Sequence, residues 1–301
     1  MKPGKALIIT AAVTATACAA LSAGMASMTV HGKRQTLEEA LAWQKNKYDT
    51  SWYDPLEKEN YMIEGYEGYT LHVQLCRCPA GSDRYVILSH GYTDNHYGCL
   101  KYMKLYLDAG FNCIIYDLRG HGENAPAPCT YSILESKDLH ALIEDTRSRY
   151  GKDILLGLHG ESLGAATTVA ALGLDQDLAF AVADCGFCEI TNVLKVGLKA
   201  MHLPGFLLAP ASLAARLLYG YSFTKMRPID ALPENHVPIL FIHGVEDTFI
   251  VPDNSRKMQA ATAGDAELCL IPEAGHAESV LVNPKLYREA VFAFLEKTVG
   301  L

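Results

Sequence analysis

The sequence lacks an excess of basic residues, and this excludes one large class of partners. Its 26 lysines and arginines are outnumbered by 34 aspartates and glutamates, which gives a formal net charge of −8. Proteins that bind nucleic acid need a basic face, because much of their affinity comes from contacts with phosphates. We therefore expect no nucleic-acid partner.

The sequence also lacks internal repeats, low-complexity tracts beyond its N-terminus, and an unusual share of glycine or proline. These absences exclude the repeat, fibrous and disordered classes of protein. Hydrophobic residues make up 50% of the 301 residues. A chain of this length and composition can form one large core, or a core with a small insertion.

A disulfide framework is absent as well. The nine cysteines are odd in number and irregular in spacing, whereas disulfide-stapled domains carry an even set. Cys113 and Cys269 stand inside apolar runs, so we predict that both are buried. Cys185 and Cys188 have the spacing of a redox or zinc pair, but no second pair stands at metal-binding distance in the sequence. We expect neither function of this pair.

The N-terminus is predicted to be a targeting segment. Lys2 and Lys5 precede an uncharged stretch, residues 6–30, that is rich in alanine and threonine. A stretch of this length can cross a bilayer about 30 Å thick, while the small residues around Met25 suit the cleavage site of a secretory signal. We predict export, with residues 1–30 as a signal peptide or as a membrane anchor whose domain faces outward. The uncleaved anchor is the favoured alternative.

Short apolar strands alternate with helices along the rest of the chain, after a predicted helix and linker at 31–60. This alternation is typical of an α/β fold, in which helices cover both faces of a parallel sheet. The turn Glu67-Gly68 predicts an initial hairpin. The predicted strands are 84–91, 111–117, 153–160, 179–186, 238–244 and 267–275, and the predicted helices are 98–110, 134–151, 162–174 and 284–298.

One segment interrupts this alternation. Between the strands 179–186 and 238–244 lie roughly fifty residues, where an ordinary connection needs far fewer. The segment is apolar and mostly helical. We predict a small helical cap at about 187–235, and the alternative is that these helices pack directly on the sheet.

Ser162 stands at the centre of the motif Gly160-Glu161-Ser162-Leu163-Gly164. An apolar strand precedes it and a helix follows it, which is the context of a nucleophile elbow. Glycines at the flanks allow the strand and helix backbones to meet, and the helix directs its positive end at the serine. We therefore predict that Ser162 is a catalytic nucleophile.

A serine nucleophile needs a base, and the base needs an acid to orient it. In a parallel sheet, both belong on loops at the carboxyl ends of later strands. Asp247 follows the strand 238–244, and His276 follows the last strand. The resulting order of serine, aspartate and histidine is the order that this elbow demands. Glu246 is the alternative acid, but the position of Asp247 between Gly244 and Pro252 fits the usual loop better.

The oxyanion of an acyl-transfer reaction needs two backbone donors. We predict that the N–H of Leu163 is one, and that the N–H of Tyr92, in the loop after the strand 84–91, is the other. Ser162 would attack an acyl carbon, with His276 as base and Asp247 as its orienting acid. This chemistry requires no metal and no cofactor.

From about Tyr61 to Leu301, the chain resembles the α/β-hydrolase superfamily. The resemblance is particular to exported or membrane-anchored bacterial hydrolases of the esterase and acyl-peptidase-like branch. It implies an eight-stranded, mostly parallel sheet with a helical cap before the acid, in a domain that spans 61–301. The motifs that carry it are His90-Gly91-Tyr92, Asp117-Leu118-Arg119-Gly120-His121-Gly122, Gly160-Glu161-Ser162-Leu163-Gly164, His243-Gly244 with Asp247, and Gly275-His276.

Other polar residues near these motifs are predicted to have structural roles. Asp117 and Arg119 are expected to pair with each other within their own loop. Four histidines that neighbour glycines at strand ends are expected to shape loops through hydrogen bonds: His90, His121, His159 and His243.

Three functions follow from this reading. The first is a serine hydrolase that cleaves a carboxylic ester of a small molecule. The second is an aminopeptidase or acyl-peptidase-like amide hydrolase acting on short peptides, in which Glu161 or Glu278 would bind a free amino terminus. The third is a non-catalytic binding module on the same fold, against which the complete set of Ser162, Asp247 and His276 argues.

Overall fold

The computed structural model describes residues 3–301, and the side chains of residue 16 and of residues 18–301. Its centre is a single mixed sheet, in which β2 runs antiparallel to both of its neighbours and every other pair of strands is parallel. The predicted α/β-hydrolase fold with an eight-stranded, mostly parallel sheet is confirmed. In spatial order the eight strands are β1 (Lys58–Glu64), β2 (Thr70–Cys76), β4 (Asn112–Tyr116), β3 (Arg84–Ser89), β5 (Leu155–Glu161), β6 (Phe180–Asp184), β7 (Ile239–Gly244) and β8 (Ala266–Ile271).

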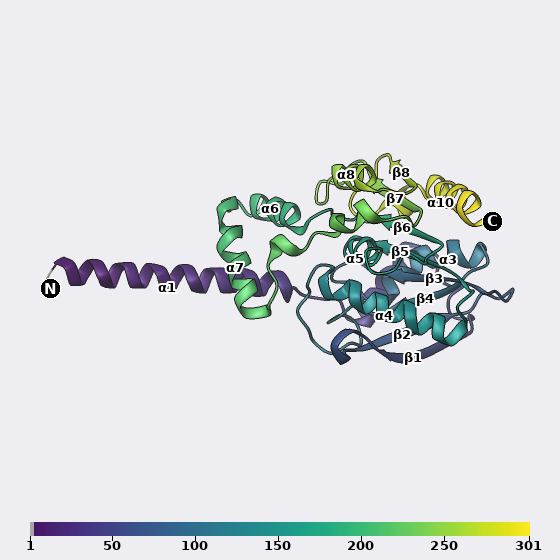
Figure 1. Ribbon diagram of the computed structural model, residues 1–301, viewed down its shortest axis with the longest axis horizontal. Helices are drawn as coiled ribbons and strands as arrows, with labels where there is room; N and C mark the ends of the chain where they lie inside the picture. Colours follow the sequence, from purple (N-terminus) through teal and green to yellow (C-terminus); the bar gives the residue numbers. More distant parts are fainter. Residues whose placement is uncertain (1–2) are drawn as a thin grey trace.

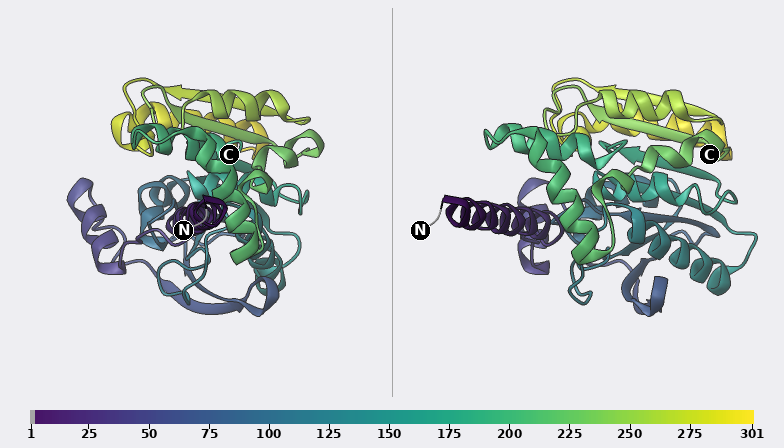
Figure 2. Two further views of the ribbon diagram at one scale, coloured as in Figure 1. Left: turned by 90° about the vertical axis from the view of Figure 1, so that its left-hand side faces the viewer. Right: turned by 60° about the vertical axis from the view of Figure 1, so that its left-hand side comes forward.

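Helices cover both faces of this sheet (Figures 1 and 2). Strand β3 illustrates why: Val86 and Leu88 face one layer of helices, Tyr85 and Ile87 face the other, and all four are buried. Successive side chains of a strand point to opposite faces, so a sheet covered on both sides needs strands that are apolar throughout. The first layer holds α3 (Leu100–Asp108) and α10 (Pro284–Val299), and the second holds α4 (Ile133–Tyr150), α5 (Leu163–Ala171) and α8 (Asp253–Ala261).

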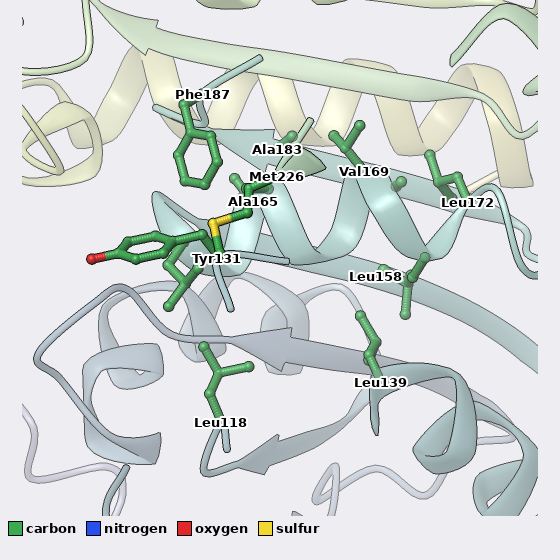
Figure 3. Close-up of a cluster of buried hydrophobic side chains, with 14 of the residues drawn as sticks. Leu118, Tyr131, Leu139, Leu158, Ala165, Val169, Leu172, Ala183, Phe187 and Met226 are labelled. Carbon is green, nitrogen blue, oxygen red and sulfur yellow. The ribbon is translucent and has the colours of Figure 1, made fainter. Parts of the chain in front are cut away.

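Helix α5 lies at the centre of the larger core. Figure 3 shows its residues Ala165 and Val169, and Leu172 directly after its end, among side chains of the neighbouring strands and helices, such as Leu158 and Leu139. These five residues are all fully buried. Burying a side chain the size of leucine stabilises the fold by about 1.5–3 kcal/mol. The helix is therefore held rigidly, and the serine directly before it is held with it.

The segment between β6 and β7 is largely helical and reaches the carboxyl ends of the parallel strands. Its helices α6 and α7 pack against each other, while η5 packs on α5 and α8 within the α/β body. In chain order the elements are α6 (Ile190–Ala200), η3 (Gly205–Leu207), α7 (Leu208–Tyr219), η4 (Phe223–Lys225) and η5 (Pro228–Glu234). The predicted interval 187–235 contains all five.

The N-terminal segment forms one helix, α1 (Pro3–Val30), which packs along α7 (Figure 1). The start of α1 extends away from the α/β body, while Ala26 and Val30 near its end are buried in the larger core. In the described part of the chain, none of the helices combines the length and the apolar character needed to cross a membrane. Export, cleavage and the domain boundaries at residues 30 and 60 stay predictions.

The helix predicted within residues 31–60 and the predicted burial of two cysteines can be compared with the structure. Thr36 and Glu39 form a capping box at the start of α2 (Leu37–Lys47). All nine cysteines lie in the described part of the chain and are free. Cys113 is buried as predicted, whereas Cys269 is only half-buried. The Sγ of Cys188 contacts the side-chain oxygen of Asn254 at 3.1 Å, so this thiol serves in packing the loop.

Candidate active site

Ser162 occupies the sharp turn between β5 and α5, with a strained φ of 53° and ψ of −110°. The two flanking glycines are required by the close approach of the backbones. A Cβ on Gly160 would lie 2.1 Å from the carbonyl oxygen of Gly164, and a Cβ on Gly164 would lie 2.0 Å from that of Ser89. No side chain fits at either position. The turn thus meets the structural requirement of a nucleophile elbow.

The structure brings the three predicted residues of the triad together. The Nε2 of His276 lies 3.0 Å from the Oγ of Ser162, and its Nδ1 lies 2.7 Å from Oδ2 of Asp247. Asp247 is in the loop after β7 and His276 is in the loop after β8. Glu246, the alternative acid, is exposed and has no part in this chain of hydrogen bonds. Of the two candidate acids, Asp247 is the one that contacts His276.

Asp247 is buried and fully engaged by hydrogen bonds. Its Oδ1 accepts the backbone N–H groups of Phe249 at 2.9 Å and Ile250 at 2.8 Å. Burial by itself would raise the pKa of this carboxyl, but hydrogen bonds from His243 and His276 lower the pKa below its usual value. An ionised Asp247 fixes His276 with its proton on Nδ1, which leaves Nε2 free to accept a proton from Ser162.

The segments that carry the two predicted oxyanion donors, Leu163 and Tyr92, both approach the serine. Leu163 is the first residue of α5, and the N–H groups of a helix's first turn have no partner within the helix. The loop after β3 approaches from the other side, because a Cβ on Gly91 would lie 3.6 Å from the Cβ of Ser162. Tyr92 follows Gly91 directly, and its side chain lines the same cavity as Ser162.

A buried charge cluster that the sequence analysis did not identify lies behind the serine. The Nζ of Lys101, on α3, pairs with the carboxylate of Glu161, the residue before the nucleophile. The same Nζ donates a hydrogen bond to the carbonyl of Ala277 at 3.4 Å, directly after His276. Lys101 therefore connects the neighbours of the proposed nucleophile and of its base. The only sequence signal was a lysine inside the apolar pattern of the helix 98–110.

Two further groups complete this cluster. The hydroxyl of Tyr102 lies 2.5 Å from Oε2 of Glu161 and 3.1 Å from Oδ2 of Asp184. Burial and the nearby charge of Glu161 raise the pKa of Asp184 to about 6. Burial would lower the pKa of Lys101, but the carboxylate of Glu161 outweighs this effect and raises the pKa. The pairing with Glu161 therefore favours the charged form of Lys101 in its buried position.

The other sequence predictions near the site have mixed outcomes. The four histidines form hydrogen bonds within the fold; for example, the N–H of Leu118 donates to Nε2 of His90 at 3.0 Å.

The predicted pairing of Asp117 with Arg119 is wrong. Arg119 binds Asp138 on α4 instead, through Nε at 2.8 Å and Nη2 at 2.7 Å. An arginine at this position reaches across to the next helix, which local sequence could not indicate.

One group of side chains in the described part of the chain has the donor types and spacing of a metal site. His96, Asp117 and Glu123 place one ligand atom each within 4.8 Å of one another. Asp117 is already engaged, because its Oδ1 accepts the backbone N–H of His96 at 2.8 Å and its Oδ2 accepts that of Glu123 at 2.9 Å. These bonds make Asp117 an organiser of its loop.

Ser162 opens into an apolar cavity of about 470 Å³. This volume is within the range of about 300–1,000 Å³ that is typical of small-molecule sites. Neither Glu161 nor Glu278, the candidates for binding an amino terminus, lines the cavity. Glu161 is paired with Lys101, and Glu278 accepts the backbone N–H of Gly275 at 3.2 Å. A larger hollow of about 1000 Å³ lies at the amino ends of β3 and β4, away from Ser162.

Comparison with known proteins relates this chain to a family. The model of the alpha/beta hydrolase family matches residues 86–290. The Bacillus subtilis protein YqkD is 29% identical over an alignment of 301 positions, which covers 97% of each chain. The alpha/beta hydrolase domain-containing protein 17C of Xenopus tropicalis is 27% identical over 256 residues, which cover 84% of this chain and 73% of that protein.

Solved structures show the same fold. An esterase from Pyrococcus furiosus superposes with a TM-score of 0.69 at 22% identity, covering 84% of this chain and 95% of the esterase. A thermophilic esterase from Thermogutta terrifontis superposes with a TM-score of 0.58 at 20% identity, covering 80% of this chain and 99% of that one. At this level of identity the likeness concerns the fold.

Proposed function

The chain belongs to the alpha/beta hydrolase family, and from this premise we propose that it is a serine hydrolase that cleaves carboxylic esters through an acyl-enzyme. One observation carries the proposal. The Oγ of Ser162, on a strained elbow, lies 3.0 Å from Nε2 of His276, whose Nδ1 lies 2.7 Å from Asp247. Hydrogen-bond contact from nucleophile to base and from base to acid is the arrangement that nucleophilic catalysis needs.

The reaction follows from these positions. Nε2 of His276 takes the proton of Ser162 as its Oγ attacks the acyl carbon. The N–H groups of Leu163 and Tyr92 stabilise the negative charge on the former carbonyl oxygen. His276 then returns the proton to the leaving alcohol, and the acyl group remains on Ser162. A water molecule, activated in turn by His276, releases the acid and restores the serine.

An ester substrate is favoured over a peptide by the character of the cavity. A peptidase that selects a free amino terminus needs an acidic side chain facing the substrate, and both candidates are engaged elsewhere. The side chains that line the cavity are predominantly apolar and uncharged, which suits an acyl or alkyl group. The structurally similar esterases add an analogy at the level of the fold.

A binding module without catalysis is disfavoured by the strain at Ser162. A non-glycine residue at a φ of 53° and ψ of −110° costs about 1–3 kcal/mol, and such strain persists mainly at functional sites. A binding surface would gain nothing from holding a serine in this conformation. It would also have no need of a buried, ionised Asp247 behind a histidine.

The test is hydrolysis of p-nitrophenyl esters by the full-length chain, beside the Ser162→Ala variant and a panel of aminoacyl anilides. We expect turnover of esters that falls by a factor on the order of 10⁶ in the variant. Anilide turnover that exceeded ester turnover would identify an amide hydrolase instead. Equal ester hydrolysis by both proteins would overturn the assignment of Ser162.

A further inference from the structure

The end of the N-terminal helix α1 is hydrogen-bonded to the active-site loops. The hydroxyls of Tyr92 and Tyr131 both donate to the carbonyl of Thr29, at 3.1 Å and 2.6 Å. The backbone N–H of Cys129 donates to the carbonyl of Val30 at 2.9 Å. Three donors from the α/β domain thus bind carbonyls at the end of a helix, which have no partner within the helix itself. Helix α1 is therefore an integral part of the domain at this end.

The same helix forms part of the cavity that opens at Ser162. Leu21, Met25 and Met28 of α1 line it on one side, and residues of α6 and α7, such as Leu194 and Leu208, line it elsewhere. Tyr92 and Tyr131, which hold the end of α1, also line the cavity. None of the described residues that line it is charged.

On the basis of the proposed function, we propose that this cavity binds the linear alkyl chain of the acyl group, and that α1 is the wall that sets its length. Three observations point there. The cavity begins at the nucleophile, its lining is apolar, and methionines are among the residues that α1 contributes. Methionine side chains are flexible and polarisable, so they adapt to an alkyl chain. The acyl carbon would lie at Ser162 and its chain would run between α1 and the helices α6 and α7.

This role requires that α1 stays attached to the mature enzyme. Cleavage near Met25, as for a secretory signal, would remove Leu21 from the wall of the cavity. Cleavage would also expose to water the apolar side chains of α6 and α7 that line the cavity. The buried position of Ala26 and Val30 in the larger core is consistent with a retained helix. The N-terminal segment is predicted to be either a cleaved signal peptide or an uncleaved anchor. A cavity wall formed by α1 requires that the segment is not cleaved.

The experiment compares two charged substitutions in the wall with a matched control. Leu21 and Met28 line the cavity and are 54% and 74% exposed, while Leu217 on α7 is 77% exposed and does not line it. The full-length variants Leu21→Asp, Met28→Asp and Leu217→Asp are assayed with p-nitrophenyl decanoate and p-nitrophenyl acetate. The readout is the ratio of kcat/KM for decanoate to kcat/KM for acetate.

We expect the ratio to fall about tenfold in Leu21→Asp and in Met28→Asp. A loss of this size corresponds to about two methylene groups of the decanoyl chain that stay in contact with water instead of being buried. The ratio in Leu217→Asp should match that of the wild type. Met25→Trp, which fills the cavity instead of charging it, should shift the preferred ester to a shorter acid. If the aspartate variants and Met25→Trp all disfavour the long ester, the effect comes from the wall of the cavity and not from a general loss of folding.

Two results would overturn the inference, and they are distinguishable. If the ratio were the same in all five proteins, wild type and the four variants, while Ser162→Ala abolished ester hydrolysis, α1 would not be part of the acyl site and the proposed function would stand. If the wild type hydrolysed neither ester, the proposed function would fail and the inference with it.

Discussion

The Cα of Gly164 lies so near the end of β3 that a Cβ added to it would be 2.0 Å from the carbonyl oxygen of Ser89. Both the helix and the strand are fixed in the core at this point, so neither backbone can move aside. The close approach places the first turn of α5 beside the loop that follows β3. The two predicted oxyanion donors, Leu163 and Tyr92, belong to these two segments.

Gly164→Ala should therefore destabilise the protein by about 3 kcal/mol, the upper end of the range for overpacked positions. The neighbouring atom is a backbone oxygen, which cannot rotate away as a side chain can. The matched control is Gly197→Ala in α6, where a Cβ would meet nothing within 4 Å. Alanine there should stabilise the helix by about 0.5–1 kcal/mol. Urea denaturation of both variants measures the difference, and equal effects would contradict the packing described here.

Removal of Lys101 should leave a buried charge without a partner. Lys101→Met strands the carboxylate of Glu161, and breaking a buried ion pair in this way costs about 3–5 kcal/mol. The double variant Lys101→Met with Glu161→Gln should recover part of that loss, because the stranded charge is gone. Lys104→Met, on the same helix but 54% exposed and paired with Asp108, should change the free energy of unfolding by about 0.5 kcal/mol at most. A cost in Lys101→Met as small as in the control would refute the pairing.

Asp247→Asn should reduce kcat by about 10⁴-fold, because an amide can no longer hold the histidine in the required tautomer. Glu246→Gln, one residue away but exposed, should keep wild-type activity. Steady-state hydrolysis of p-nitrophenyl acetate, with circular dichroism to verify folding, distinguishes the two. The opposite pattern would show that Glu246 is the acid.

Asp184 should make stability depend on pH in a defined window. Its pKa is raised from 3.8 to about 6 in the folded protein, by burial and by the charge of Glu161. Between these values the folded state binds a proton that the unfolded state has released, so this group's contribution to stability falls as pH rises. Asp184→Asn removes that contribution. The Tm of the variant relative to wild type should therefore be higher at about pH 7.5 than at about pH 4.5. A difference in Tm that did not change with pH would contradict the raised pKa.

Much of the fold and site followed from the sequence because the signals are local. Apolar strands alternating with helices define the parallel sheet, and the elbow motif predicts that Ser162 lies on the turn between a strand and a helix, where the structure places it. Asp247 and His276 then follow from a topological rule, since functional side chains gather at the carboxyl ends of parallel strands. Asp247 and Glu246 stand in the same loop, and the spacing from Gly244 and Pro252 already favoured Asp247 in the sequence; the structure adds that Asp247 contacts His276.

The features that the sequence did not reveal depend on contacts between distant segments. Helix α8 was not predicted, because its buried face includes the polar residues Asn254 and Ser255, and this gives little apolar periodicity. The pairing of Lys101 with Glu161 joins residues far apart in the chain. Nothing in the composition of α1 indicates that it lines the cavity beside Ser162. Each of these is a property of packing, which propensity and periodicity do not encode.

The most direct test of the account is to label the protein with an alkyl fluorophosphonate and locate the adduct by mass spectrometry of the intact chain and its peptides. The reagent reacts only with a serine that a neighbouring base activates. We predict one adduct, on Ser162, which is absent in Ser162→Ala and forms far more slowly in His276→Ala. Absence of any adduct, or an adduct that persists in Ser162→Ala, would contradict the central claim that Ser162 is the activated nucleophile.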